Sequence, residues 1–122
     1  MFAVIYRSYL KPGCESAYKE LWNKIATYFI QHRGAIGSTL HQTEDGMWVA
    51  YSRWPDKATR DASWPGESKP SDKLPESIQE AILSIQTCVD QNRKHPEICM
   101  HIVDDLLINN WISKTINPME GY

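Results

Sequence analysis

Hydrophobic residues in the first third of the chain follow two different spacings. Residues 2–10 carry apolar and aromatic side chains at both odd and even positions, which is typical of a β-strand covered on both faces. After a Pro-Gly break at 12–13, apolar residues return every three or four positions, as in a helix with one buried stripe. This stripe predicts a helix from Cys14 to Arg33 that ends at Gly34, because glycine adopts a left-handed cap most easily.

The next segment has the pattern of a β-hairpin that leads into a helix. Residues 35–42 and 47–54 are compatible with strands, and the Asp-Gly pair at 45–46 supplies the turn between them. Pro55 suits the first turn of a helix, where its missing N–H has no partner to lose. Residues 56–63 are therefore expected to form a short helix or turn.

The second half of the chain opens with a segment, 64–75, that is rich in proline and polar residues. It is predicted to be a loop, and a lid over a pocket is one interpretation of it. Apolar residues then recur at helical spacing behind a Ser-x-x-Glu capping box, which predicts a second long helix ending near Lys94. The last strand is expected at 98–108, and the polar tail at 109–122 is expected to dock on a partner or to fray.

The predicted order of elements is strand, helix, strand, strand, helix, strand. Right-handed crossovers then place both long helices on one face of a four-stranded antiparallel sheet, which is the ferredoxin-like α+β fold. A chain of 122 residues fits one domain, placed here at 1–108 and followed by the tail. Because the sheet is apolar on both faces and no further element is left to cover the open one, a homodimer is predicted.

Composition and charge exclude several classes of function. The net charge of −2 gives no basic field for nucleic acid or anionic lipid, so neither nucleic acid nor a membrane is an expected partner. No apolar run approaches the ~20 residues that a membrane helix needs, and the N-terminus has no basic leader, so a cytoplasmic location is expected. The three widely spaced cysteines favour reduced thiols. No metal-binding or phosphate-binding motif is recognised, and we expect no metal and no cofactor.

The aromatic strand at 49–54 that runs into Pro55-Asp56-Lys57-Ala58 resembles the antibiotic biosynthesis monooxygenase-type domain of the dimeric α+β barrel superfamily. The resemblance is specific over about residues 1–64, and beyond them only the order of elements matches. It implies a small oxygenase that oxidises phenolic or quinol substrates with O2, without metal or flavin, in a pocket between sheet and helices. Haem-degrading relatives need a histidine in a helix of the second half, and residues 65–94 contain none, so haem degradation is disfavoured.

Candidate site residues follow from this implied pocket. Aromatic side chains expected to form its walls, and so to bind substrate, are Tyr6, Trp22, Trp48 and Trp64. His41 is the first choice for a catalytic proton acceptor because imidazole titrates near neutrality, and His101 is nearly as plausible. Tyr51 is the other catalytic candidate, as a donor to a substrate oxygen. The competing interpretation is core packing for the tryptophans and simple exposure for His41.

Two functions remain open at this point. The first is a small cofactor-independent monooxygenase that acts on an aromatic or quinol-type metabolite. The second is a non-catalytic dimeric barrel that binds a small apolar ligand in a stress-response or regulatory role. The second is favoured by Ser63, which stands where many relatives of this family carry a histidine, and by the lack of a tight acid–base pair in the sequence.

Overall fold

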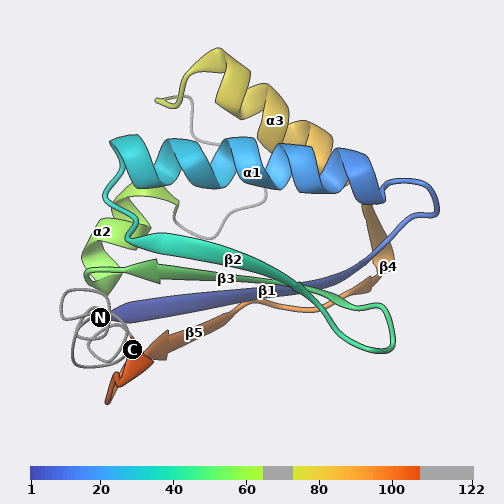
Figure 1. Ribbon diagram of the computed structural model, residues 1–122. Coiled ribbons are helices and arrows are strands. Elements are labelled where there is room, and N and C mark those ends of the chain that lie inside the picture. Colours follow the sequence, from blue (N-terminus) through green and yellow to red (C-terminus); the bar gives the residue numbers. More distant parts are fainter. Residues whose placement is uncertain (65–72, 108–122) are drawn as a thin grey trace, which may run out of the picture.

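The computed structural model of the protein describes residues 1–64 and 73–107. Its elements, in chain order, are β1 (Phe2–Leu10), α1 (Glu15–His32), β2 (Gly37–Gln42), β3 (Trp48–Trp54), α2 (Lys57–Ser63), α3 (Glu76–Thr87), β4 (Val89–Lys94) and β5 (Ile98–His101). The sheet is antiparallel, with strand order β2-β3-β1-β4, and β5 also pairs with β1. Helices α1 and α3 lie on the same side of it (Figure 1). The predicted ferredoxin-like α+β fold is thereby confirmed.

The central strand β1 has a different partner at each end of one edge. Its first residues, from Phe2 to Ile5, pair with β5, whereas Ser8 and Leu10 pair with β4. Residues 95–97 separate the two short strands, and Pro96 has no N–H to donate to a strand ladder. The fourth strand position of the expected sheet is therefore filled by two strands with a break between them.

Two predicted boundaries in the second half are wrong. Helix α3 ends at Thr87, and residues 89–94, which were expected to continue it, form β4. Most of this segment is polar and exposed, so it cannot extend the buried stripe of a helix and pairs instead with the free edge of β1. The last strand ends at His101 instead of 108. Of the predicted loop at 64–75, residues 65–72 lie outside the described residues, as does the tail at 109–122.

The end of α1 shows why Gly34 is a glycine. Its backbone takes a left-handed φ of 81°, which other residues rarely adopt. A Cβ at this position would also lie 3.1 Å from Cγ2 of Thr59 in α2. The chain can therefore turn sharply after α1 and let α2 approach closely.

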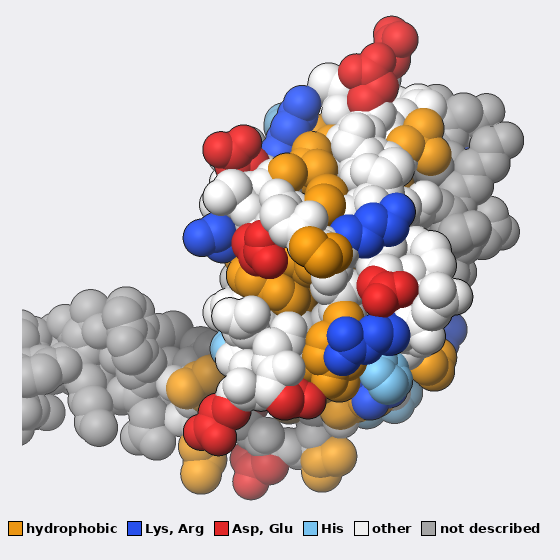
Figure 2. All heavy atoms as spheres, turned by 90° about the vertical axis from the view of Figure 1, so that its right-hand side faces the viewer, with side chains coloured by type: hydrophobic (Ala, Val, Ile, Leu, Met, Phe, Trp, Pro, Cys, Tyr) orange, Lys and Arg blue, Asp and Glu red, His pale blue; other side chains and the backbone are white. Residues whose placement is uncertain are grey.

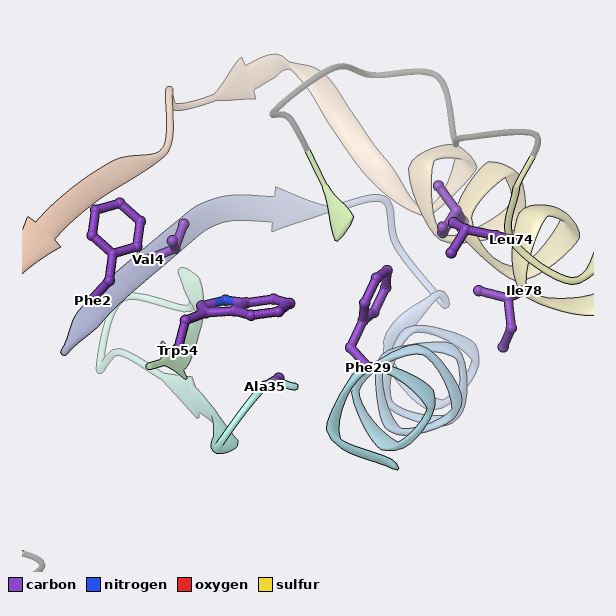
Figure 3. Packing of buried hydrophobic residues seen from close by; sticks show 8 residues of the cluster. Phe2, Val4, Phe29, Ala35, Trp54, Leu74 and Ile78 are labelled. Atoms are coloured by element: carbon purple, nitrogen blue, oxygen red, sulfur yellow. The ribbon is translucent and has the colours of Figure 1, made fainter. Parts of the chain in front are cut away.

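The hydrophobic core lies between the sheet and the two long helices. Its buried members are Phe2, Val4, Phe29, Ala35, Trp54, Leu74, Ile78 and Ile82. The rings of Phe29 from α1 and Trp54 from β3 lie between helix and sheet (Figure 3), with their centroids 6.2 Å apart. The apolar stripes of α1 and α3 thus face the sheet, as their spacing predicts.

Strand parity divides the sheet into a helix side and an open side. Phe2 and Val4 of β1 belong to the core, so the even-numbered residues of this strand face the helices and the odd-numbered ones face away. On the open side lie Ala3, Ile5, Val49, Tyr51, Ile98 and Met100, which share the odd register of β1 or pair with it. Among the described residues no helix covers this open side (Figure 1).

The surface at the hairpin end of the sheet carries both signs of charge. Acidic and basic side chains are interspersed there, with hydrophobic side chains between them (Figure 2). Mixed charge of this kind creates no extended field of one sign on this face. Within the described ranges, no helix combines the length and the apolar character that crossing a bilayer requires.

Candidate functional site

A cavity of about 500 Å³ lies between the helices and the helix side of the sheet. Small-molecule sites in proteins typically measure roughly 300–1,000 Å³, and this volume lies within that range. Its apolar wall is formed by Trp22, Ile25, Ala26, Ala50, Trp54, Trp64, Ile82, Ile85 and Val89. The wall draws on both long helices and on the central strands, so the fold itself creates the cavity.

Polar side chains also line the cavity, and Tyr6 and Glu97 are two of them. Tyr6 comes from the helix side of β1, and Glu97 comes from the break between β4 and β5. His95 also lies in this wall, but its ring packs beside Tyr9, with centroids 6.4 Å apart, and Tyr9 has the parity of the open side. Glu97 supplies a carboxylate to the cavity wall, and His95 and Lys94 are further groups in it that can exchange a proton.

A buried arginine connects these polar groups. The side chain of Arg60 is 4% exposed and reaches them from α2. Its Nη2 donates to Oε2 of Glu97 at 2.7 Å and to the Tyr6 hydroxyl at 3.3 Å. The bond to the carboxylate is charge-assisted and fixes the carboxylate more firmly than a neutral bond would. We call Tyr6, Arg60 and Glu97 the polar triad.

Helix α2 places Arg60 at this point because its start is well defined. Asp56 is the N-cap, and its side chain accepts a hydrogen bond of 2.7 Å from the backbone N–H of Thr59. Asp at this position satisfies an amide that has no partner inside the helix. Arg60 follows one turn later, on the face of α2 that is turned toward the sheet.

Electrostatics keep two members of the polar triad in defined protonation states. Burial by itself would lower the pKa of Arg60, but its hydrogen bonds to Glu97 and Tyr6 outweigh this effect and raise that pKa above its ordinary value. Burial raises the pKa of Tyr6, although the bond from Arg60 opposes the change. At neutral pH Arg60 is thus a cation and Tyr6 a neutral hydroxyl. Because the Tyr6 oxygen accepts from Arg60, its own proton is available to a ligand.

The structure brings three of the predicted site residues together. Tyr6, Trp22 and Trp64 all line the cavity. Trp48 lies on the helix side of β3 as well, but behind the wall, where its ring packs against Tyr18 with centroids 5.7 Å apart. Tyr18 itself is part of the wall, so Trp48 supports the cavity without lining it.

The two predicted catalytic residues lie on the other side of the sheet. Tyr51 pairs with Ile5, and His41 pairs with Val49, so both have the parity of the open side. His41 is exposed, and its Nε2 lies 2.8 Å from the hydroxyl of Thr39. Neither residue lines the cavity, because alternate residues of a strand point to opposite faces, and their catalytic role stays a prediction.

Sequence reasoning missed Arg60 and Glu97. Arg60 stands in a short polar helix, where an arginine normally points to solvent, and no local pattern indicates its burial. Glu97 lies just beyond the predicted end of the second long helix, near Lys94, where the sequence offered no reason to place a site residue. Placing a strand at 89–94 would have put Glu97 beside β1 and close to Tyr6. Within residues 1–64 and 73–107, no group of three His, Cys, Asp or Glu side chains could hold a metal ion.

Fold and cavity together define a class of protein, the ferredoxin-like domain with a cavity between its sheet and helices. The family model described as antibiotic biosynthesis monooxygenase matches residues 1–63, just over half of the chain. The protein belongs to this family.

Solved structures of low sequence identity share the fold. One is an antibiotic biosynthesis monooxygenase, with 19% identity, a TM-score of 0.62, and coverage of 85% of this chain and 100% of that one. Another is SnoaB, a cofactor-independent oxygenase from Streptomyces nogalater, with 11% identity, a TM-score of 0.64, and coverage of 86% and 95%. A conserved protein from Methanosarcina mazei Go1 has 13% identity, a TM-score of 0.63, and coverage of 82% and 90%. No curated protein matches the sequence significantly.

Proposed function

We propose that the protein is a cofactor-independent monooxygenase that oxidises an aromatic, phenolic or quinol-type metabolite inside the cavity. The observation that carries this proposal is the cavity itself, in which aromatic walls are combined with Tyr6 and Glu97. Membership of the monooxygenase family and the shared fold with the Streptomyces oxygenase support it.

The proposed reaction needs little from the protein beyond binding, proton removal and exclusion of water. A substrate hydroxyl gives its proton to Glu97, and the resulting phenolate transfers an electron to O2. One oxygen atom then forms a new carbonyl on the ring and the other leaves as water, so that a phenol and O2 give a quinone and H2O. The apolar wall shields the reactive intermediates from solvent.

Each member of the site has a distinct role in this proposal. Trp22 and Trp64 hold the flat ring of the substrate, and Tyr6 donates to its oxygen. Glu97 is the proton acceptor, in place of His41 and Tyr51, because it lies in the cavity wall. Transfer of the substrate proton to Glu97 neutralises the carboxylate and leaves the negative charge on the phenolate. The same cation, Arg60, compensates the charge of the carboxylate before the transfer and that of the phenolate after it.

Oxygen consumption tests the proposal directly. We expect the purified protein, with a chelator present, to consume O2 when it is given bicyclic or tricyclic phenols or hydroquinones. The rate should saturate with substrate concentration and should fall when a close-fitting inert arene is added. If every substrate of such a panel is oxidised only as fast as in buffer, the protein is not an oxygenase of this kind.

A non-catalytic role in binding a small apolar ligand is the second candidate. The observation that favours it is Ser63, whose hydroxyl donates to the carbonyl of Arg33 at 3.4 Å and which is not among the residues that line the cavity. Binding of an arene without any oxygen uptake is the result expected for this role.

We also propose that the protein is a homodimer whose two open sheet faces pack against each other. The support is the apolar character of this face, on which Ile98 is 37% exposed and Ile5, Val49 and Tyr51 are only half-buried in the single chain. Large apolar faces of this kind are normally covered, and a second copy covers both at once.

A further inference from the structure

We infer that Arg60 is a positioning residue that turns Tyr6 and Glu97 into one recognition unit for a ligand hydroxyl. This inference rests on the proposed function only in taking the cavity as the ligand site. It adds a specificity determinant: the polar triad selects ligands whose oxygen can both accept and donate a hydrogen bond.

The geometry of the polar triad supplies one donor and one acceptor to the cavity. Arg60 bonds to Tyr6 and Glu97 through the same nitrogen, so the distance between their two oxygens is fixed by one guanidinium. The Tyr6 oxygen accepts from Arg60, which leaves its O–H free to donate. The Glu97 carboxylate has a second oxygen, whose neighbour is the thiol of Cys99 at 3.6 Å, a weak donor.

A hydroxyl is the ligand group that matches this pair. It accepts from the Tyr6 O–H through its lone pair and donates its own proton to Glu97. A carbonyl or an ether has no proton to donate, so it cannot form the hydrogen bond to Glu97, whose side chain is 28% exposed and paired with Arg60. A site built to hydrogen-bond a substrate hydroxyl discriminates against the analogue that lacks it.

Stability alone gives Arg60 little reason to be present. A buried ion pair often contributes no more to stability than apolar residues of the same volume, because desolvation offsets the attraction. Here Nε of Arg60 is also buried and has no hydrogen-bond partner, which adds to the cost. A guanidinium held at this cost beside a cavity is accounted for by what it positions.

The experiment compares the binding of 1-naphthol and 1-methoxynaphthalene by calorimetry under nitrogen. The two ligands share the ring system, but the ether cannot donate a hydrogen bond. We expect the wild-type protein to bind the naphthol at least ten-fold more tightly. In Arg60→Met the ratio of the two affinities should fall to near one, while the ether binds within about two-fold of wild type. Equal affinities in the wild-type protein, or an unchanged ratio in Arg60→Met, would overturn the inference.

Two further variants separate positioning from a structural effect. Arg60→Lys keeps the positive charge but cannot reproduce the planar fork of the guanidinium, so an intermediate ratio is expected. Glu97→Ala removes the acceptor that only the naphthol can use and leaves Arg60 in place, and it should reduce the ratio even if Arg60→Met does not fold. A Glu97→Ala variant that keeps the full wild-type ratio would count against the inference.

The same data distinguish this inference from the proposed function. Selective binding without oxygen uptake would refute the monooxygenase proposal and leave the role of Arg60 standing. Oxygen uptake with phenols, together with equal affinities for 1-naphthol and 1-methoxynaphthalene, would refute the role of Arg60 and leave the monooxygenase proposal standing.

Discussion

Replacing Glu97 by Gln is expected to lower the turnover number for oxygen uptake by at least about 100-fold, since a positioned general base typically contributes 10²- to 10⁴-fold. The amide keeps an oxygen that can accept from Arg60 but cannot take a proton. Because substrate contacts with the aromatic wall remain, KM should change far less than kcat. Initial rates over a range of substrate concentrations measure both constants.

The matched control for this variant is His41→Gln. His41 is exposed on the open side of the sheet, so its loss should leave the rate within about two-fold of wild type. This comparison separates the base that the structure indicates from the one that the sequence suggested. Full activity in Glu97→Gln together with a large loss in His41→Gln would indicate that the reaction takes place on the open side of the sheet.

Val49→Asp is expected to convert the protein from a dimer into a monomer. Val49 lies on the open side of β3, opposite Arg7 of β1 and beside the other apolar residues of this face. In the proposed dimer each copy would bury one new carboxylate opposite Arg7, and the desolvation of a buried charge costs several kcal/mol, which the attraction of an ion pair often does not offset. Light scattering at micromolar concentration should give about twice the 14.1 kDa of one chain for the wild-type protein and one chain mass for the variant.

Leu83→Asp provides the control for the dimer experiment. Leu83 is 52% exposed on α3, on the helix side of the molecule, so a charge there should leave the mass unchanged. Circular dichroism of both variants checks that the fold is retained. A wild-type mass of one chain, or a Val49→Asp variant that stays dimeric, would contradict the proposed interface.

The elements that repeat a local pattern could be predicted from the sequence. The apolar stripe of α1 identifies a helix that buries one face, and the short apolar and aromatic run of β1 is typical of a strand covered on both faces. Strand β4 could not be identified in this way. Most of its residues are polar and exposed, and it exists because Ser8 and Leu10 of β1 offer it an edge to pair with. Such pairing depends on the tertiary structure and leaves no periodicity in the sequence.

Of the candidate site, only the aromatic side chains of the cavity wall could be predicted from the sequence. Tyr6 and Arg60 are 54 positions apart, and Arg60 and Glu97 are 37 apart, so no motif connects them. The misplacement of Tyr51 was avoidable, because Trp48 and Trp54 occupy the even positions of the same strand and Tyr51 an odd one. Side chains that alternate in this way cannot share a cavity on one face.

The central claim is that the ligand binds between sheet and helices, and an NMR titration with 1-naphthol tests it most directly. The signals to follow are the indole N–H protons of Trp22 and Trp64, in the cavity wall, and the ring protons of His41, on the open side. The claim predicts saturable shifts of both indole signals and no change at His41. Shifts at His41 with both indole signals unchanged would contradict it.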